Sequence, residues 1–214
     1  MQRLTILLCV LLPGAALAAE PTGVLDGWTH GAAPIHMTRS DAPVGRIDAD
    51  GSIHLALPVP PASLQTAART FARCEGLEVS GGEVTVSPAT LFVDHGQGEV
   101  YLFAANSSGI AAWQASFGET PLYEGAWMQW VHASGHARIA GSCVTSRHTA
   151  SSGDAPAFDE RVEYDVRLVP GWNHLRQAIE GVHVEPDGSR HVRLQSIRTV
   201  DAVPADMRWF SDRR

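Results

Sequence analysis

The sequence contains no lysine, because all 16 of its basic residues are arginine. This absence excludes Schiff-base catalysis, a lysine general base and isopeptide cross-links through a lysine side chain. We attribute it to a GC-rich coding bias rather than to function. Arginine is therefore the only side chain of the protein that carries a permanent positive charge.

Long apolar runs are absent beyond the first residues of the chain. Arg3 precedes an apolar stretch over residues 4–12, which is followed by the helix-breaking pair Pro13-Gly14 and by small residues at 16–18. This pattern is typical of a secretory signal peptide, and the stretch is too short to span a bilayer. We expect residues 1–18 to be removed and the mature protein to be periplasmic or secreted, without a transmembrane segment.

Positive charge is scarce relative to negative charge. The chain has 16 basic and 23 acidic residues, and its formal net charge is −7. Loss of Arg3 with the signal peptide makes the net charge one unit more negative. An acidic chain of this kind is a poor partner for nucleic acid or for anionic lipid. We expect a protein or a small ligand of unknown identity as the partner, and the sequence leaves the oligomeric state open.

Cysteine is also rare, with three residues in the whole chain. Cys9 lies inside the apolar run, so only Cys74 and Cys143 remain after removal of the signal peptide. Two thiols in an exported protein predict one disulfide, and neither cysteine lies in a Cys-x-x-Cys or a nucleophile motif. We expect this disulfide to join the end of a helix to a strand over residues 138–144.

Short strands separated by glycine-rich turns indicate a mainly β fold. Three segments suit a three-residue hairpin loop whose last position is a glycine with positive φ: residues 49–51, 133–135 and 186–188. The last loop predicts that His183 lies opposite His191, and the first that Ile47 lies opposite Ile53. A slip of one residue would mix polar and apolar faces, so the hydrophobic pattern specifies the register.

Further strands follow from turn residues and alternation. A turn at residues 80–83 predicts a tight hairpin between the strands on either side of it. Residues 91–94 and 100–105 are expected to pair with each other. Residues 160–168 alternate fully between apolar and charged side chains, which is typical of a strand in a sheet with one solvated face.

One helix is expected, with Ser63 as the N-cap of residues 64–73. Together these elements predict an antiparallel β-sandwich or a partly open barrel built from hairpins, with one short helix. We expect four segments in the chain: a signal peptide over 1–18, an N-terminal β-hairpin module over 20–60, a helical connector over 61–76 and a main antiparallel β domain over 77–214.

Ten histidines raise the question of a metal site. The predicted hairpins make His183 and His191, and likewise His132 and His136, cross-strand neighbours with Cβ atoms about 5 Å apart. Two imidazoles at that separation can share zinc or copper. No third ligand and no His-Glu-x-x-His motif accompanies them, so we expect no metal and keep these four residues as the candidate ligands.

The predicted hairpin over residues 127–144 supplies the candidate partner surface. A three-residue loop would place Met128, Trp130 and Arg138 together on the exposed face. A two-residue loop would instead bury Trp130 with Ile139. The turn residues favour the first register only slightly, and both stay open.

The usual catalytic motifs are missing. No Gly-x-Ser-x-Gly elbow is found, and residues 48–51 resemble only the start of a calcium loop, without its later ligands. Residues 106–108 match an N-glycosylation sequon, which we attribute to chance. We therefore expect no catalytic residues and no cofactor.

Two motifs resemble those of a group of uncharacterised exported β-rich proteins of GC-rich bacteria. They are Gly171-Trp172-Asn173, which follows the alternating strand, and Met207-Arg208-Trp209-Phe210 near the end of the chain. The hairpin over residues 46–57 resembles the edge of a transthyretin-like or carboxypeptidase-regulatory β-sandwich. The first resemblance implies an exported β-rich domain and the second the edge of a β-sandwich, and neither supplies catalytic residues.

The resulting prediction is a non-catalytic envelope or secreted binding protein. One alternative is an exported hydrolase or metal-dependent enzyme built on the histidine-bearing strands. Another is a secreted enzyme inhibitor, which would need an exposed rigid loop such as the polar segment over residues 145–157.

Overall fold

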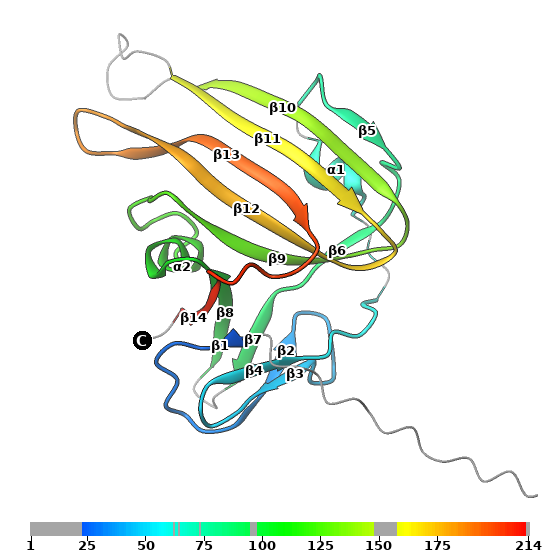
Figure 1. Ribbon diagram of the computed structural model, residues 1–214, viewed down its shortest axis with the longest axis vertical. Coiled ribbons are helices and arrows are strands. Elements are labelled where there is room, and N and C mark those ends of the chain that lie inside the picture. The colour runs from blue at the N-terminus through cyan, green and yellow to red at the C-terminus, as the bar shows by residue number, and fades with distance from the viewer. Residues whose placement is uncertain are drawn as a thin grey trace, which may run out of the picture.

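The computed structural model describes residues 23–61, 63, 65–72, 74–94, 98–147 and 158–212. The expected signal peptide and most of the loop expected over 145–157 lie outside these residues. Within them the chain forms 14 strands and two short helices (Figure 1). The fold is mainly β, as predicted, and the strands follow one hydrogen-bonded path that is not closed into a barrel.

The larger part of this path is a layer of long strands. Its members in spatial order are β9 (Gly125–Ala133), β12 (Gly171–Val184), β13 (Arg190–Val200), β11 (Phe158–Leu168), β10 (Ala137–Arg147) and β5 (Glu78–Ser80). A short strand, β6 (Val86–Pro88), also pairs with β9. β11 and β13 run parallel, so the sheet is mixed and not built from antiparallel hairpins alone.

The smaller part consists of strands from the first half of the chain, with one short strand from its C-terminal end. Its members in spatial order are β1 (Gly23–Val24), β4 (Ser52–Leu55), β3 (Gly45–Ile47), β2 (Ala33–Met37), β7 (Leu91–Asp94) and β8 (Glu99–Ala105). β14 (Arg208–Ser211) pairs with β8, and β8 meets β9 through Ala105 and Trp127. The expected N-terminal module thus contributes β1 to β4, which join the other strands through β2 and β7.

Two helices are present among the described residues, where the sequence predicts one. The expected helix is shorter than predicted: α1 (Ala67–Phe71) begins after Thr66, whose hydroxyl accepts a hydrogen bond from Arg69 N–H at 3.3 Å. Ser63 instead accepts from Gln65 N–H one turn earlier. The second helix, α2 (Ser108–Ala115), was not predicted. Neither helix is long and apolar enough to cross a bilayer.

Two predicted hairpin loops are confirmed in detail. Ile47 pairs with Ile53, and His183 pairs with His191. The closing glycines Gly51 and Gly188 have φ of +86° and +90°, which glycine adopts without steric cost. The pairing of β7 with β8 and the alternation along β11 are also as predicted.

Two other predicted hairpins are wrong, and they fail in the same way. The chain does reverse at residues 81–85 and again at 134–136, but the strands on either side of each reversal separate. β5 pairs with β10, and β6 pairs with β9. The two reversals contact each other, since Thr85 N–H donates to Ser134 Oγ at 3.1 Å and Ser134 N–H donates to Thr85 O at 3.0 Å.

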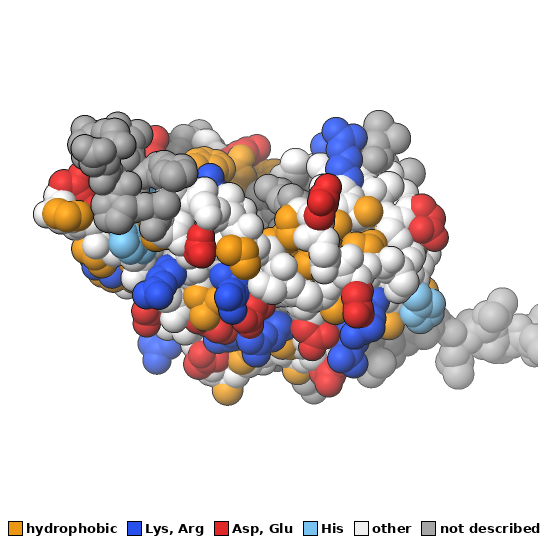
Figure 2. Space-filling view, turned by 90° about the horizontal axis from the view of Figure 1, so that it is seen from above, with side chains coloured by type: hydrophobic (Ala, Val, Ile, Leu, Met, Phe, Trp, Pro, Cys, Tyr) orange, Lys and Arg blue, Asp and Glu red, His pale blue; other side chains and the backbone are white. Residues whose placement is uncertain are grey.

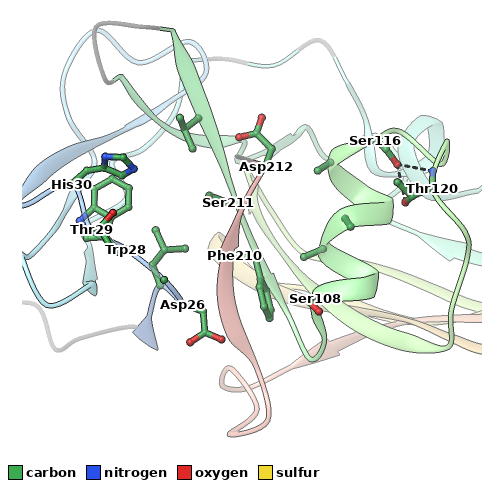
Figure 3. A pocket seen from close by; sticks show the side chains of 16 residues that line it. Asp26, Trp28, Thr29, His30, Ser108, Ser116, Thr120, Phe210, Ser211 and Asp212 are labelled. Carbon is green, nitrogen blue, oxygen red and sulfur yellow. Dashed lines mark hydrogen bonds between the residues drawn. The ribbon is translucent and has the colours of Figure 1, made fainter. Parts of the chain in front are cut away.

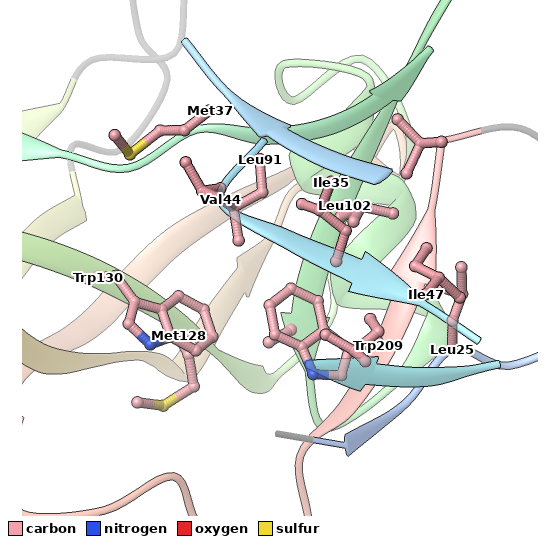
Figure 4. Close-up of a cluster of buried hydrophobic side chains, with 13 residues drawn as sticks. Leu25, Ile35, Met37, Val44, Ile47, Leu91, Leu102, Met128, Trp130 and Trp209 are labelled. Atoms are coloured by element: carbon pink, nitrogen blue, oxygen red, sulfur yellow. The ribbon is translucent and has the colours of Figure 1, made fainter. Parts of the chain in front are cut away.

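Strand β9 is buried on both faces, because the two parts of the fold pack against opposite sides of it. Val131 faces a cluster that contains Phe71 of α1 and residues of the long strands. Met128 and Trp130 face a second cluster, which Trp209 of β14 and the short strands complete (Figure 4). Most side chains on both faces of β9 are therefore apolar and buried, and the strand does not alternate between apolar and polar residues.

The predicted disulfide is present. Cys74 and Cys143 are bonded, with 5.8 Å between their Cα atoms. Cys74 follows α1 and Cys143 lies in β10, so the bond joins the end of the helix to the expected strand. It also holds α1 against the apolar cluster around Val131.

Candidate ligand-binding groove

A groove of about 1050 Å³ lies between residues 25–30, helix α2 and strand β14 (Figure 3). Its volume is at the upper end of the range for small-molecule pockets, which is about 300–1,000 Å³. Three segments that are far apart in the sequence form its walls and floor. Their positions follow from backbone hydrogen bonds and from the packing of α2.

Residues 25–30 are fixed against β14 at one side of the groove. Leu25 forms a parallel bridge with Trp209, and Asp26 N–H donates to Trp209 O at 3.1 Å. Leu25 N–H also donates to Gly51 O at 2.8 Å, in the confirmed hairpin loop between β3 and β4. The turn at Gly51 therefore helps to hold this wall.

Helix α2 forms the opposite wall. Ser107 caps it by accepting a hydrogen bond from Ile110 N–H at 3.3 Å, and Ile110 is fully buried in a third apolar cluster with Trp127. The groove side of the helix carries small residues, Ser108, Ala111, Ala112 and Ala115. Small side chains on this face leave the space that becomes the groove.

The floor is apolar and aromatic, and the wall opposite α2 combines Trp28 with the polar residues Asp26, Thr29 and His30. Phe210 of β14 lies between α2 and residues 25–30, and Val100 of β8 also lines the groove. Trp28 stands at the far wall, where its Nε1 donates to Gly31 O at 2.6 Å and its ring meets His30 edge-on at 5.1 Å. The indole orientation is therefore set before any ligand arrives.

Two carboxylates line the groove, and they differ in their surroundings. Asp26 lies 3.8 Å from the guanidinium of Arg208, so its charge is partly balanced. Asp212 accepts a hydrogen bond from Tyr101 N–H through Oδ1 at 3.0 Å. Its Oδ2 has no hydrogen-bond partner among the described residues. Asp212 is thus oriented and available.

Negative charge gathers near Asp212. The Tyr101 hydroxyl donates to Glu99 at 2.7 Å, and this hydrogen bond raises the pKa of Tyr101, with Glu99 and Asp212 charges acting in the same direction. Asp94 lies directly opposite Glu99 in β7. Among the described residues that line the groove, none is an arginine. By contrast, basic and acidic side chains are intermixed on the face shown in Figure 2.

The predicted partner surface does not exist as one patch. Met128 and Trp130 are each only 6% exposed, because the smaller part of the fold covers that face of β9. Arg138 is exposed on β10, where it lies 3.4 Å from Glu78 of β5. Neither predicted register of the 127–144 hairpin applies, since β9 and β10 are not partners.

The histidine pairs are placed as follows. His183 and His191 are cross-strand partners, but His183 stacks on Phe158 at 4.3 Å and His191 contacts Glu185 at 2.8 Å. His132 lies edge-on to Trp172 at 5.3 Å, and burial lowers its pKa. His136 is exposed in the turn after β9, which does not pair with β10, so it is not a cross-strand neighbour of His132.

No group of three histidine, cysteine or acidic side chains that could hold a metal occurs within the described part of the chain. The sequence predicts that His132 and His136 are cross-strand neighbours, but the hairpin that would pair them does not form. The ring of His183 stacks on Phe158, and the ring of His191 contacts Glu185.

The groove is not evident from the sequence. Its one local signal is the start of α2, where Ser107 precedes a run of helix-forming residues. Residues 106–108, which match a glycosylation sequon, have structural roles instead. Asn106 Oδ1 accepts a hydrogen bond from Ala126 N–H at 2.8 Å, and Ser107 caps the helix. Trp28 and Phe210 carry no local signal of a ligand.

Comparison of the chain with protein-family models, with curated proteins and with solved structures finds no match. The functional interpretation therefore rests on the residues and geometry of the molecule itself.

Proposed function

We propose that this protein is an exported, non-catalytic binding protein whose ligand occupies the groove between residues 25–30, α2 and β14. The groove itself is the observation that carries the proposal. Its lining combines apolar and aromatic side chains, among them Trp28, Val100 and Phe210, with an equal share of polar or charged residues. This combination is typical of binding sites in proteins.

The polar groups of the groove support binding rather than catalysis. The Ser116 and Thr120 hydroxyls hydrogen-bond to each other at 3.0 Å, and Ser116 Oγ also accepts from Thr120 N–H. Asp212 accepts a hydrogen bond from Tyr101 N–H, and Trp28 Nε1 donates one to Gly31 O. These contacts keep the walls in place before a ligand arrives, which lowers the entropy cost of binding.

The export part of the proposal rests on the signal-peptide pattern and on the disulfide. Disulfides persist in oxidising compartments such as the periplasm or the extracellular space. Expression of the full chain in a Gram-negative host, followed by fractionation and intact-mass measurement, tests this part. We expect the periplasmic form to lack the first 18 or 19 residues, and a cytoplasmic product of full mass would contradict it.

A fragment screen tests the groove. Ligand-observed NMR with a library of neutral, cationic and anionic fragments is expected to find binders of the purified protein. Ala112→Trp places a large ring in the groove and should abolish their binding. Glu119→Trp adds the same ring outside the lining and should leave it unchanged. Fragments that bind Ala112→Trp as well as the wild type would show that the groove is not the site.

A further inference from the structure

Asp212 lines the groove, and Glu99 is a second carboxylate in contact with the same tyrosine. Glu99 and Asp212 both contact Tyr101, one through its hydroxyl and the other through its backbone N–H. Asp94 lies directly across from Glu99 in β7. Carboxylates in and near a groove attract ligands of the opposite sign.

The rest of the groove suits the apolar stem of such a ligand. Phe210 and Val100 provide an apolar floor, and Trp28 provides an aromatic ring in a fixed orientation. Arginine and lysine bury their methylene stems on apolar surface while the charged head stays polar, and their heads are attracted to the face of tryptophan. Asp212 Oδ2 is available to accept a charge-assisted hydrogen bond.

The size and openness of the groove favour a peptide over a small molecule. About 1050 Å³ exceeds the space that most small ligands need, and the groove is partly open to solvent. A protein without lysine, with net charge −7, also complements a basic partner over a longer range.

We propose that the groove binds an extended peptide segment of a partner protein and places one of its arginine or lysine side chains between Trp28 and Asp212. This inference rests on the proposed function and adds the charge and the chemical class of the ligand. Asp212 accepts hydrogen bonds from the cationic head, and Phe210 contacts the stem. Asp26, which Arg208 partly balances, contributes less.

Matched peptides test the role of charge. The probes are an acetylated and amidated pentapeptide, Gly-Leu-Arg-Leu-Gly, and the same peptide with citrulline in place of arginine, which keeps the shape and removes the charge. Isothermal titration should show the arginine peptide binding about tenfold more tightly. Raising the salt to about 1 M, where the screening length is about 3 Å, should remove most of this difference.

Conservative variants test the position. Asp212→Asn keeps the acceptor for Tyr101 N–H, so the fold should persist, and it should lower affinity for the arginine peptide about five- to tenfold without changing affinity for the citrulline peptide. Asp206→Asn removes an exposed carboxylate outside the groove and should change neither affinity. Trp28→Leu should weaken both peptides, and the arginine peptide more.

The two residues after Asp212 are arginines. Their charge has the same sign as that of the proposed ligand. The peptide titrations therefore include a double variant, Arg213→Gln with Arg214→Gln. It should bind the arginine peptide at least as tightly as the wild type. A loss of affinity in this variant would contradict attraction of the peptide by Asp212.

The outcomes separate the two proposals. Equal affinity for the arginine and citrulline peptides, or an unchanged arginine affinity in Asp212→Asn, would overturn the inference about charge and leave the groove as a binding site. Fragments that bind in an Ala112-dependent way while neither peptide binds would also overturn the inference alone. Failure of peptides and fragments together would overturn the proposed function as well.

Discussion

Trp130 of β9 and Trp209 of β14 stack with 5.1 Å between their ring centroids and 18° between their planes. Trp209 is 2% exposed and Trp130 is 6% exposed. The contact joins the central strand of the fold to the segment that carries Phe210 and Asp212. It therefore connects the core to one side of the groove.

Replacement of either tryptophan should destabilise the whole fold. Trp130→Ala and Trp209→Ala are each expected to lower the free energy of unfolding by about 3–5 kcal/mol, because each leaves a large cavity. The double variant should lose about 0.5–1.5 kcal/mol less than the sum, which is the coupling of the stacked pair.

Urea denaturation followed by circular dichroism measures these changes. Phe117→Ala is the control, because Phe117 is 98% exposed. Alanine and phenylalanine at this position share the same left-handed backbone, with φ of +54°, so the change should stay within about 0.5 kcal/mol. A stable, cooperative Trp130→Ala variant would contradict the buried role of this residue.

The two confirmed hairpin loops differ in what surrounds their glycines. A Cβ at Gly188 would meet no atom within 4 Å, whereas a Cβ at Gly51 would lie 2.9 Å from Leu25 O. Gly188→Ala should therefore cost only the left-handed conformation, about 1 kcal/mol. Gly51→Ala should cost more, because the added carbon also pushes against the segment that forms one groove wall.

The two glycine variants are compared by thermal unfolding and by fragment binding. Gly51→Ala should weaken binding in the groove, and Gly188→Ala should leave it unchanged. Equal losses of stability in the two variants, with binding intact in both, would mean that the turn at Gly51 does not hold residues 25–30 in place.

The predicted registers show what local sequence can and cannot specify. The pairing of His183 with His191 follows from an Asp-Gly loop between alternating strands, since the turn and both faces lie within one short segment. Gly81 and Gly135 give the same local signal, yet no hairpin forms at either. A Cβ at Gly81 would overlap His136 O, so this glycine permits close contact between two reversals.

The groove was beyond prediction for a related reason. Its lining comes from segments near both ends of the chain and from α2, which meet only through contacts distant in sequence. The burial of Met128 and Trp130 likewise depends on strands that precede them by many residues. Composition and local pattern predicted the β class and the disulfide, because neither requires the order of the strands.

The disulfide should contribute substantially to stability. Cys74 and Cys143 are 69 positions apart, and closing a loop of that length in the unfolded chain is worth about 4 kcal/mol in the entropy model. The double variant Cys74→Ala with Cys143→Ala should show this loss in urea denaturation, and reduction of the wild type should match it. A decrease in the free energy of unfolding of less than about 1 kcal/mol would indicate that packing alone holds α1 against β10.

His132 should make the stability depend on pH. Burial lowers its pKa in the folded protein, whereas the unfolded chain has the ordinary value of about 6.5. As the pH falls below about 6.5, the unfolded chain takes up a proton that folded His132 does not, so the free energy of unfolding decreases. The contribution of neutral His132 is fully present above that pH.

Thermal unfolding between about pH 8 and pH 5.5 measures this effect. His132→Gln should flatten the decline towards acid, because glutamine fills much of the same space beside Trp172 without taking a proton. His136→Gln, at an exposed position in the turn after β9, is the matched control and should keep the wild-type slope. If His132→Gln retained the full decline, protonation of His132 would not be its source, and the edge-on contact with Trp172 would be compatible with either charge state.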